Sequence, residues 1–395
     1  MGATLEKLFE PIKINKLEVK NRVCYAPTGK SHFTEDGYMT DQAICYYVAR
    51  AKGGTGLLIV EVCLPHTKYA RPLHRLLGCW DDSQLAGLRN LAEAIHAAGA
   101  KAVVQESLGF GSQAMFPIRG EVVAPSDVPT SIQKGGAPRG LQYMEGVTGT
   151  TPRPLTKVEI VELEDAFALG AERLMKAGFD GLEIHGCHGY LIAEFLSPYS
   201  NKRQDEYGGS LENRLRLALN LLKKSREKVG ADFIIGFRMS GDEHIEGGYD
   251  LEEGQKIARE IEKAGADYIH ISSGRYEVMN RMLPDKEGTM LQEARAIKEA
   301  VKLPVICPNI HDPLTGEKAL QEGMADMVSL SRGLIADPAW ANKAREGRIK
   351  EINRCILCNT CLKTLFSGFT IRCAVNPEVG WERFIPEYHP PIRGR

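Results

Sequence analysis

The chain has 395 residues, of which 43% are hydrophobic, 26% charged and 7% aromatic, a composition that excludes wholesale disorder and low-complexity sequence. Lysine and arginine number 50 against 51 acidic residues, so the formal net charge is −1, and no overall basic field exists to bind nucleic acid. No apolar run approaches the roughly 20 residues of a membrane span, and residues 1–21 do not form a signal peptide. We expect a cytoplasmic protein with no nucleic-acid or membrane partner.

Eight short runs rich in β-branched and apolar residues recur along the chain, and amphipathic stretches long enough for helices separate them. Eight continuous apolar strands with crossover helices indicate a parallel sheet buried on both faces, either closed as a barrel or open and doubly wound. The count of eight favours an α/β fold of the (β/α)8 TIM barrel type. The predicted strands are 23–28, 56–62, 101–107, 181–186, 233–240, 268–272, 304–309 and 327–333; the clearest helices are 81–98, 157–176, 211–228, 251–263 and 293–300.

Two segments depart from this repeat. Residues 108–156 separate the third strand from its helix with scattered glycines and prolines, and a loop of this length is usually functional. We interpret it as a lid-like insertion over the pocket, the alternative being a decoration without a role. The second segment follows Gly347 and carries four clustered cysteines. The expected organisation is therefore a barrel over residues 1–347 and a cysteine-bearing segment with a tail over 348–395.

The fourth predicted strand ends in a group of polar side chains, His185, His188 and Tyr190. In a barrel, residues just past the carboxyl ends of the strands face the active site. The two histidines alone fit half of a metal site, a hydrogen-bonded pair or two packed rings. As a neutral pair they would suit a substrate oxygen that gains negative charge, and Tyr190 could supply a proton. Packing of Tyr190 beneath the insertion is the alternative.

A longer stretch around these residues is recognisable. Residues 180–214 read DGLEIHGCHGYLIAEFLSPYSNKRQDEYGGSLENR, which closely resembles the signature of the old yellow enzyme family of FMN-dependent ene-reductases. The motif KNRV at 20–23 leading to Pro27, and RGLIADP at 332–338, join the resemblance. It covers residues of about 5 to 350 and implies a TIM barrel with FMN across its mouth.

Carried over position by position, the resemblance implies the contacts of this cofactor. Gln105 would face the pyrimidine ring, and Arg238 would stabilise the anion that reduced flavin becomes; a surface ion pair is the alternative for Arg238. The loops after strands seven and eight would bind the phosphate. The FMN-binding residues implied are Pro27, Thr28, Gly29, Val62, Gln105, Arg238, Asn309, Ser331 and Arg332.

The sequence departs from the family pattern at four positions, Gly29, Asn309, Ser331 and Gly333. Asn309 stands where glycine is usual, and Ser331-Arg332-Gly333 replaces Gly-Arg-Pro. Asn tolerates unusual backbone angles and a serine hydroxyl can bond phosphate, so we expect binding to survive. Gly29 stands where many relatives place Cys or Thr near the flavin, and losing that hydrogen-bond donor would lower the flavin potential.

The reaction that the resemblance implies is reduction of the C=C bond of an α,β-unsaturated carbonyl compound, such as an enone, enoate or enoyl-CoA. Hydride would pass from flavin N5 while His185 and His188 hold the carbonyl oxygen and Tyr190 gives the proton. A trimethylamine dehydrogenase-like amine dehydrogenase or demethylase is the alternative, although a cationic amine would prefer an aromatic bowl to N–H donors. A non-catalytic electron-transfer subunit is a third interpretation.

Four of the ten cysteines lie within 19 residues, spaced C-x2-C-x2-C-x11-C: Cys355, Cys358, Cys361 and Cys373. In a chain that reads as cytoplasmic, such clustering indicates metal, and the spacing fits a [4Fe–4S] cluster or a zinc site. The segment resembles the 2,4-dienoyl-CoA reductase branch of the family, which implies the [4Fe–4S] cluster, although the middle spacing there is more often three residues.

Because a cluster passes single electrons, the resemblance implies an electron donor other than the substrate. NAD(P)H would be the ultimate source, through an FAD/NAD(P)H module that relatives carry beyond the cluster, or through a separate reductase or ferredoxin. A truncated chain and a natural short form both fit the sequence, and assembly into a homo-oligomer is compatible with it.

Overall fold

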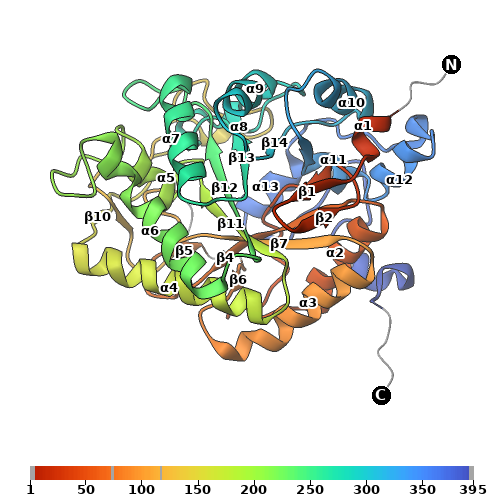
Figure 1. The fold of residues 1–395 in the computed structure, drawn as a ribbon, viewed down its shortest axis with the longest axis horizontal. Helices are drawn as coiled ribbons and strands as arrows, with labels where there is room; N and C mark the ends of the chain where they lie inside the picture. Colours follow the sequence, from red (N-terminus) through yellow and green to blue (C-terminus); the bar gives the residue numbers. More distant parts are fainter. Residues whose placement is uncertain (1–4, 73–74, 116–117, 391–395) are drawn as a thin grey trace.

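The computed structural model describes residues 5–72, 75–115 and 118–390. Parts of the predicted domains 1–347 and 348–395 lie outside the described residues, namely residues 1–4, 73–74 and 391–395, as do residues 116–117 of the insertion. Eight parallel strands pair in a ring that closes between the first two strands (Figure 1), which confirms the predicted TIM barrel. The barrel strands are β3 (Val23–Tyr25), β4 (Leu57–Leu64), β7 (Lys101–Glu106), β11 (Gly181–Gly186), β12 (Ile234–Ser240), β13 (Tyr268–Ser272), β14 (Val305–Cys307) and β15 (Met327–Leu330).

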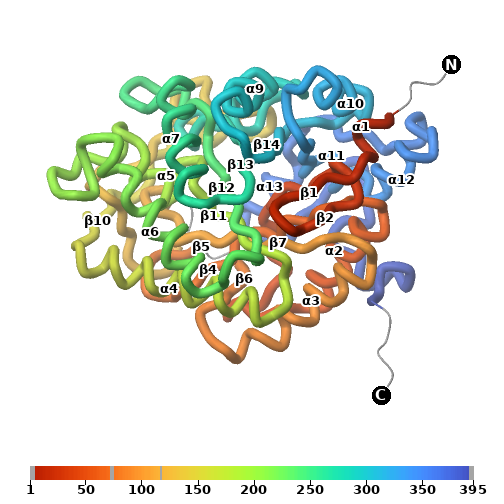
Figure 2. The backbone as a smooth tube through the Cα atoms, in the orientation of Figure 1, coloured from red at the N-terminus to blue at the C-terminus, as the bar shows by residue number. Residues whose placement is uncertain are grey.

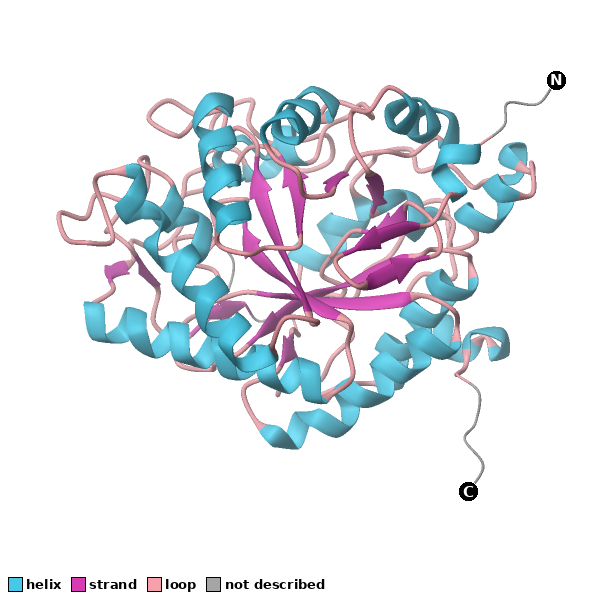
Figure 3. Cartoon of the chain, viewed as in Figure 1, coloured by secondary structure: helices cyan, strands magenta, loops and turns pink. Residues whose placement is uncertain are grey.

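Helices surround the strands on the outside of the barrel (Figure 3). Polar caps start the long ones: the hydroxyl of Thr156 accepts a hydrogen bond from the backbone N–H of Glu159, whose carboxylate bonds back. None of the helices in the described part of the chain is long and apolar enough to cross a membrane. The outer helices are α2 (Asp41–Lys52), α3 (Leu85–Ala97), α4 (Lys157–Lys176), α6 (Leu211–Val229), α7 (Leu251–Lys263), α9 (Leu291–Ala300), α10 (Pro313–Gln321), α11 (Arg332–Ala336) and α12 (Trp340–Arg345).

Three strands are shorter than predicted, and one of them, predicted as 327–333, ends at Leu330 just before α11 begins. The predicted strand 23–28 ends at Tyr25, before Pro27, and the predicted strand 304–309 ends at Cys307, before Pro308. Proline has no N–H to donate to the ladder, so the chain leaves the sheet there. The residues beyond these strands are therefore free to line the barrel mouth.

The opposite end of the barrel is filled by apolar side chains. A hairpin of β1 (Ile12–Ile14) and β2 (Leu17–Val19) carries Ile14 and Val19 into one apolar cluster with barrel residues such as Leu57 and Met327. All four side chains are fully buried. This packing fills the barrel core at its amino end, whereas ligand sites of such barrels form at the carboxyl ends of the strands.

The insertion 108–156 holds little regular structure. Its short strands β8 (Ile118–Arg119), β9 (Val123–Ala124) and β10 (Arg153–Pro154) pair with β5 (Arg71–Pro72) or with each other, while β6 (Leu77–Gly78) extends the barrel sheet beside β4. The backbone N–H of Gln133 donates to the carbonyl of Glu277, and that of Asn280 to Gly136. The insertion therefore lies against the loop that follows β13, at the mouth of the barrel.

The cysteine-bearing segment and tail pack against the barrel. Helix α13 (Thr360–Phe366) follows the first three cysteines, and Leu362 and Ile371 belong to the same apolar cluster as the outer barrel helices. Farther along, the chain runs beside α2 (Figure 2). There the buried guanidinium of Arg50 lies 2.8 Å from a carboxylate oxygen of Glu382. This buried ion pair joins the tail to the barrel. The remaining helices are α1 (Glu6–Phe9), α5 (Leu191–Leu196) and α8 (Met279–Met282).

Candidate functional site

One pocket opens at the carboxyl ends of the barrel strands. The residues that the sequence singled out on seven of the barrel strands, or on the loops that follow them, converge on it, as expected for a closed barrel. Every candidate in the barrel lines this pocket, namely Pro27, Thr28, Gly29, Val62, Gln105, His185, His188, Tyr190, Arg238, Asn309, Ser331 and Arg332, and so does Cys361 from the cysteine-bearing segment.

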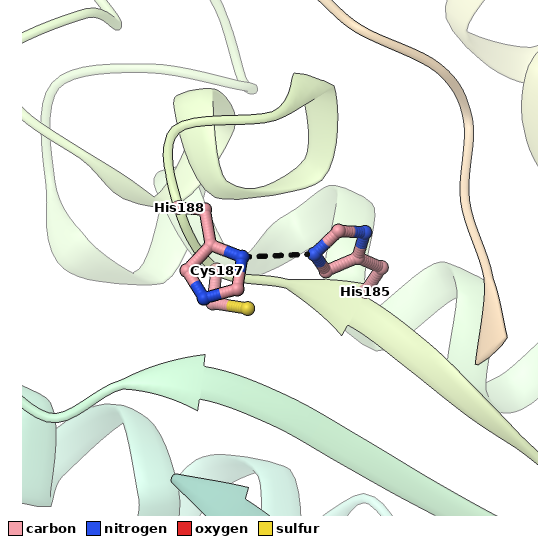
Figure 4. Close-up of side chains that lie close together, drawn as sticks. All are labelled: His185, Cys187 and His188. Carbon is pink, nitrogen blue, oxygen red and sulfur yellow. Dashed lines mark hydrogen bonds between the residues drawn. The ribbon is translucent and has the colours of Figure 1, made fainter. Parts of the chain in front are cut away.

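His185 and His188 form a hydrogen-bonded pair. His185 Nε2 lies 3.3 Å from His188 Nδ1 (Figure 4), and His188 Nε2 lies 2.6 Å from the hydroxyl of Ser272. Burial, followed by the positive charge of Arg238, lowers the pKa of both imidazoles well below the usual value. The pair is therefore neutral at neutral pH, and each ring can donate only one N–H.

Together with His185 and His188, Cys187 forms a group of three side chains that could ligate a metal ion, with ligand atoms within 4.8 Å of one another. Within residues 5–72, 75–115 and 118–390 it is the one such group of histidine, cysteine, aspartate or glutamate side chains. The Cys187 side chain is fully buried and is not part of the pocket lining, and burial raises the pKa of its thiol to about 12. The two imidazoles already bond each other, and His188 also bonds Ser272. Of the three interpretations, the hydrogen-bonded pair is the one that this geometry matches.

Tyr190 faces the pocket beside the histidines. Its ring centroid lies 4.8 Å from that of His185, and its hydroxyl lies 2.8 Å from the hydroxyl of Tyr276. Burial raises the pKa of Tyr190 well above 10, with the nearby Tyr276 as the next cause. The phenol therefore keeps its proton at every physiological pH. Tyr276 was not predicted from the sequence, although its position just after β13 indicates that it lies at the barrel mouth.

Gln105 and Arg238 stand on strands that flank β11. The side-chain amide of Gln105 donates to Glu183 over 2.8 Å. Arg238 is 7% exposed, and its Nε is buried without a partner among the described residues. The surface ion pair considered for Arg238 is therefore wrong. A buried guanidinium with a free donor favours an anionic or carbonyl-rich ligand.

Asn309, Ser331 and Arg332 lie together at the far end of the pocket. Asn309 has a φ of 61°, a left-handed conformation that explains why glycine is usual there and why Asn is tolerated. The Ser331 hydroxyl lies 2.5 Å from that of Thr28. Arg332 is nearly buried and donates to the side chain of Asn359 over 2.8 Å. This end of the pocket offers hydroxyl and guanidinium donors that suit a phosphate.

The packing of neighbouring side chains accounts for a glycine at position 29. A Cβ at this position would lie 3.1 Å from Cδ2 of Leu365 and 3.6 Å from a carboxylate oxygen of Glu61. Leu365 comes from α13, so the cysteine-bearing segment fills the space that a side chain at position 29 takes in many relatives. Leu362 and Phe366 of the same helix also line the pocket. The sequence offered no signal for these contacts, because helix α13 is remote along the chain.

The four predicted cysteines are all partly or fully buried and lie close to Arg332. Burial lowers the pKa of Arg332, and the nearby Cys355 and Cys361 act in the opposite direction. Burial, opposed by the charge of Arg332 and assisted by Cys355 and Cys373, raises the pKa of Cys361 to about 12. Four thiols within electrostatic reach of one another, beside a cation, fit a group that binds thiolates.

Comparison with known proteins identifies relatives over nearly the whole chain. The chain is 41% identical over 382 residues to an NADH oxidase of Thermoanaerobacter brockii, covering 95% of this chain and 56% of that protein. It is 35% identical over 401 residues to a cinnamate reductase of Clostridium sporogenes, covering 95% and 58%. A solved structure of a 2-naphthoyl-CoA reductase complex superposes with a TM-score of 0.86 at 33% identity, covering 96% of this chain and 58% of that one.

The chain thus spans between half and two thirds of the length of these relatives. A model of the NADH:flavin oxidoreductase / NADH oxidase family matches residues 7–351, the same stretch in which the twelve barrel candidates converge on one pocket. With that match and the shared barrel, the chain belongs to the NADH:flavin oxidoreductase / NADH oxidase family.

Proposed function

We propose that the chain is an FMN-dependent ene-reductase that reduces the C=C bond of an α,β-unsaturated carbonyl compound. One observation carries this proposal: a neutral histidine pair and a protonated phenol face the same pocket as Gln105 and Arg238. A carbonyl oxygen that gains negative charge needs neutral N–H donors, and the neighbouring carbon needs a proton.

The pocket fits FMN. Arg238 Nε and His185 Nδ1 are both buried without a partner among the described residues, and burying polar atoms in this way is costly unless a ligand bonds them. Arg238 and Gln105 would hold the ring system, and Asn309, Ser331 and Arg332 the phosphate. When bound, FMN supplies the hydride for the β-carbon of the substrate.

The histidines and tyrosine act on the substrate. On substrate binding, His185 Nε2 and His188 Nδ1 would give up the hydrogen bond between them. Each would instead donate to the carbonyl oxygen, which draws electron density from the alkene. Tyr190 would hold the proton at its hydroxyl and give it to the α-carbon. Tyr276, whose hydroxyl lies 2.8 Å away, would donate to the oxygen of Tyr190 as negative charge forms there.

Four aromatic rings line the substrate side of the pocket in series: Phe110, Tyr190, Tyr276 and Phe366. Ring centroids lie 5.2 Å apart for the first pair, 5.5 Å for the second and 6.4 Å for the third. Edges and faces of aromatic rings pack well against flat conjugated molecules. This wall favours a substrate whose alkene is conjugated with an aryl group, in keeping with the names of the cinnamate and naphthoyl-CoA reductases.

Cys355, Cys358, Cys361 and Cys373 would hold a [4Fe–4S] cluster, which supplies single electrons beside the pocket. Cys361 itself lines the pocket wall, so the path from these thiols to the flavin is short. NAD(P)H would be the ultimate electron source, through a further module or a separate donor protein.

The test is cofactor content followed by turnover. Anaerobically purified protein is expected to contain FMN and about four irons and four sulfides per chain, without zinc. With a low-potential reductant it is expected to reduce benzylideneacetone and not to oxidise trimethylamine. Turnover of the amine alone would favour the amine dehydrogenase alternative, and FMN with zinc but no iron would make the cysteine-bearing segment structural.

A further inference from the structure

A row of polar side chains crosses the barrel interior directly beneath the pocket. Backbone pairing places Gln105, Glu183, Gly236 and Tyr268 side by side on β7, β11, β12 and β13. Gly236 leaves room in this row: a Cβ there would lie 2.0 Å from the ring of Tyr268. The Tyr268 ring therefore extends across the position of Gly236, and its hydroxyl reaches Glu183.

Three hydrogen-bond donors converge on the Glu183 carboxylate, which is fully buried. Gln105 Nε2 donates to Oε1 over 2.8 Å, and the Tyr268 hydroxyl donates to Oε2 over 3.1 Å. His270 Nδ1 lies 2.8 Å from Oε2. Burial acts to raise the pKa of Glu183, but the hydrogen bonds from His270 and Gln105 and the charge of Arg238 outweigh it, and the pKa is lowered. The carboxylate is therefore ionised and accepts all three bonds.

The ionised carboxylate determines how its neighbours are oriented. Burial lowers the pKa of His270, so the ring is neutral and carries its single proton on Nδ1, facing Glu183. Its Nε2 then accepts from the Ser329 hydroxyl, 2.9 Å away. Gln105 gives its NH2 group to Glu183, so its carbonyl oxygen is left for the pocket. Gln105 and Ser329 both line that pocket, and both present oxygen acceptors to it.

We propose that Glu183 is a positioning residue: through Gln105 it makes one side of the pocket floor a hydrogen-bond acceptor, matched to the N3–H donor of a flavin pyrimidine ring. Arg238, on the adjacent strand, supplies donors for the neighbouring carbonyl oxygen. A free Gln side chain can turn either end toward a ligand, whereas the Glu183 carboxylate allows only one orientation. Glu183 does not touch the pocket itself. This inference rests on the proposed FMN site.

The test compares FMN dissociation constants of the reconstituted full chain, measured by quenching of FMN fluorescence. Glu183→Gln, which lets the Gln105 amide turn, is expected to weaken binding about tenfold, the effect of one hydrogen bond. Gln105→Leu is expected to do the same. The double variant is expected to lose about tenfold and not about a hundredfold, because Glu183 acts through Gln105.

Two further variants distinguish the orientation of the Gln105 amide from the charge of Glu183 and from effects of substitution on folding. Glu183→Asp keeps the charge but is too short to reach the Gln105 amide, so it is expected to weaken FMN binding without raising the flavin midpoint potential. Glu183→Gln removes a buried anion near the flavin and is expected to raise that potential. Glu106→Gln is the matched control: Glu106 is fully buried on the same strand as Gln105, beside Cys79, and its substitution is expected to leave FMN binding unchanged.

The outcomes are separable. A wild-type chain that does not bind FMN refutes the proposed function. A wild-type chain that binds FMN and reduces the enone, with Glu183→Gln and Glu183→Asp both binding as tightly, refutes the role of Glu183 alone. Additive losses in the double variant would also overturn it. If Glu183→Gln does not fold, the dissociation constants of Glu183→Asp and of its double variant with Gln105→Leu decide.

Discussion

Glu194 is expected to make the stability of the protein fall as the pH rises, and Glu194→Gln is expected to remove this dependence. The carboxyl group is fully buried on α5. One oxygen accepts the backbone N–H of Ser112 over 2.7 Å and also the Ser112 hydroxyl, while Oε2 has no partner among the described residues. Burial raises the pKa of Glu194 to about 8, although the Ser112 hydrogen bonds and Arg275 oppose the shift.

The direction of the pH effect follows from the difference between the pKa of Glu194 in the folded chain and that in the unfolded chain. Below pH 4.5, the ordinary pKa of a glutamate, the carboxyl is protonated in both the folded and the unfolded chain. Between pH 4.5 and about 8 the unfolded chain ionises while the folded chain keeps its proton, which costs about 1.4 kcal/mol of stability per pH unit. At pH 8 this one group lowers the free energy of unfolding by at most about 5 kcal/mol. Gln cannot ionise, and its carbonyl oxygen can still accept from Ser112.

Urea unfolding at pH 5, 6, 7 and 8 measures the effect as the difference in unfolding free energy between variant and wild type. Glu194→Gln is expected to be close to wild type at pH 5 and more stable by at least about 1.4 kcal/mol at pH 8. Glu164→Gln is the control, because Glu164 is equally buried but ion-paired to Lys224 over 2.9 Å; it is expected to lose stability. Parallel stability curves for wild type and Glu194→Gln would refute the reasoning.

Three further outcomes are expected. Tyr190→Phe should reduce enone turnover by about 10²- to 10⁴-fold, the usual share of a general acid, with FMN content unchanged; full activity would contradict the assigned proton donor. Arg50→Met leaves the buried Glu382 carboxylate unpaired and should lower the free energy of unfolding by about 3–5 kcal/mol, measured by urea titration; a loss below about 1 kcal/mol would contradict a buried pair. Cys373→Ser should lower the iron content measured by elemental analysis but not FMN, and unchanged iron would exclude Cys373 as a ligand.

Local patterns in the sequence were enough to predict the barrel and most of its mouth. The eight apolar runs, with helical stretches between them, predicted the strands correctly because burial on both faces requires continuous apolar residues. The barrel itself then predicted where polar residues after each strand would meet. His185 and Tyr190 could be placed at the mouth for this reason and Arg238 through the family resemblance, and the structure brings all three together in one pocket.

Other features depend on contacts between distant segments, which no local pattern encodes. The sequence predicted that a hydrogen-bond donor is missing at Gly29, but only the structure shows that Leu365 from α13 lies where a Cβ at this position would make a tight contact. Likewise, Tyr276 bonds Tyr190 across 86 positions of the chain, and the direction of the Gln105 amide depends on Glu183 on the neighbouring strand. Sequence determined which groups reach the barrel mouth, because strand direction is a local property. Tertiary structure decided their protonation and orientation, because both depend on burial and on neighbours brought together by folding.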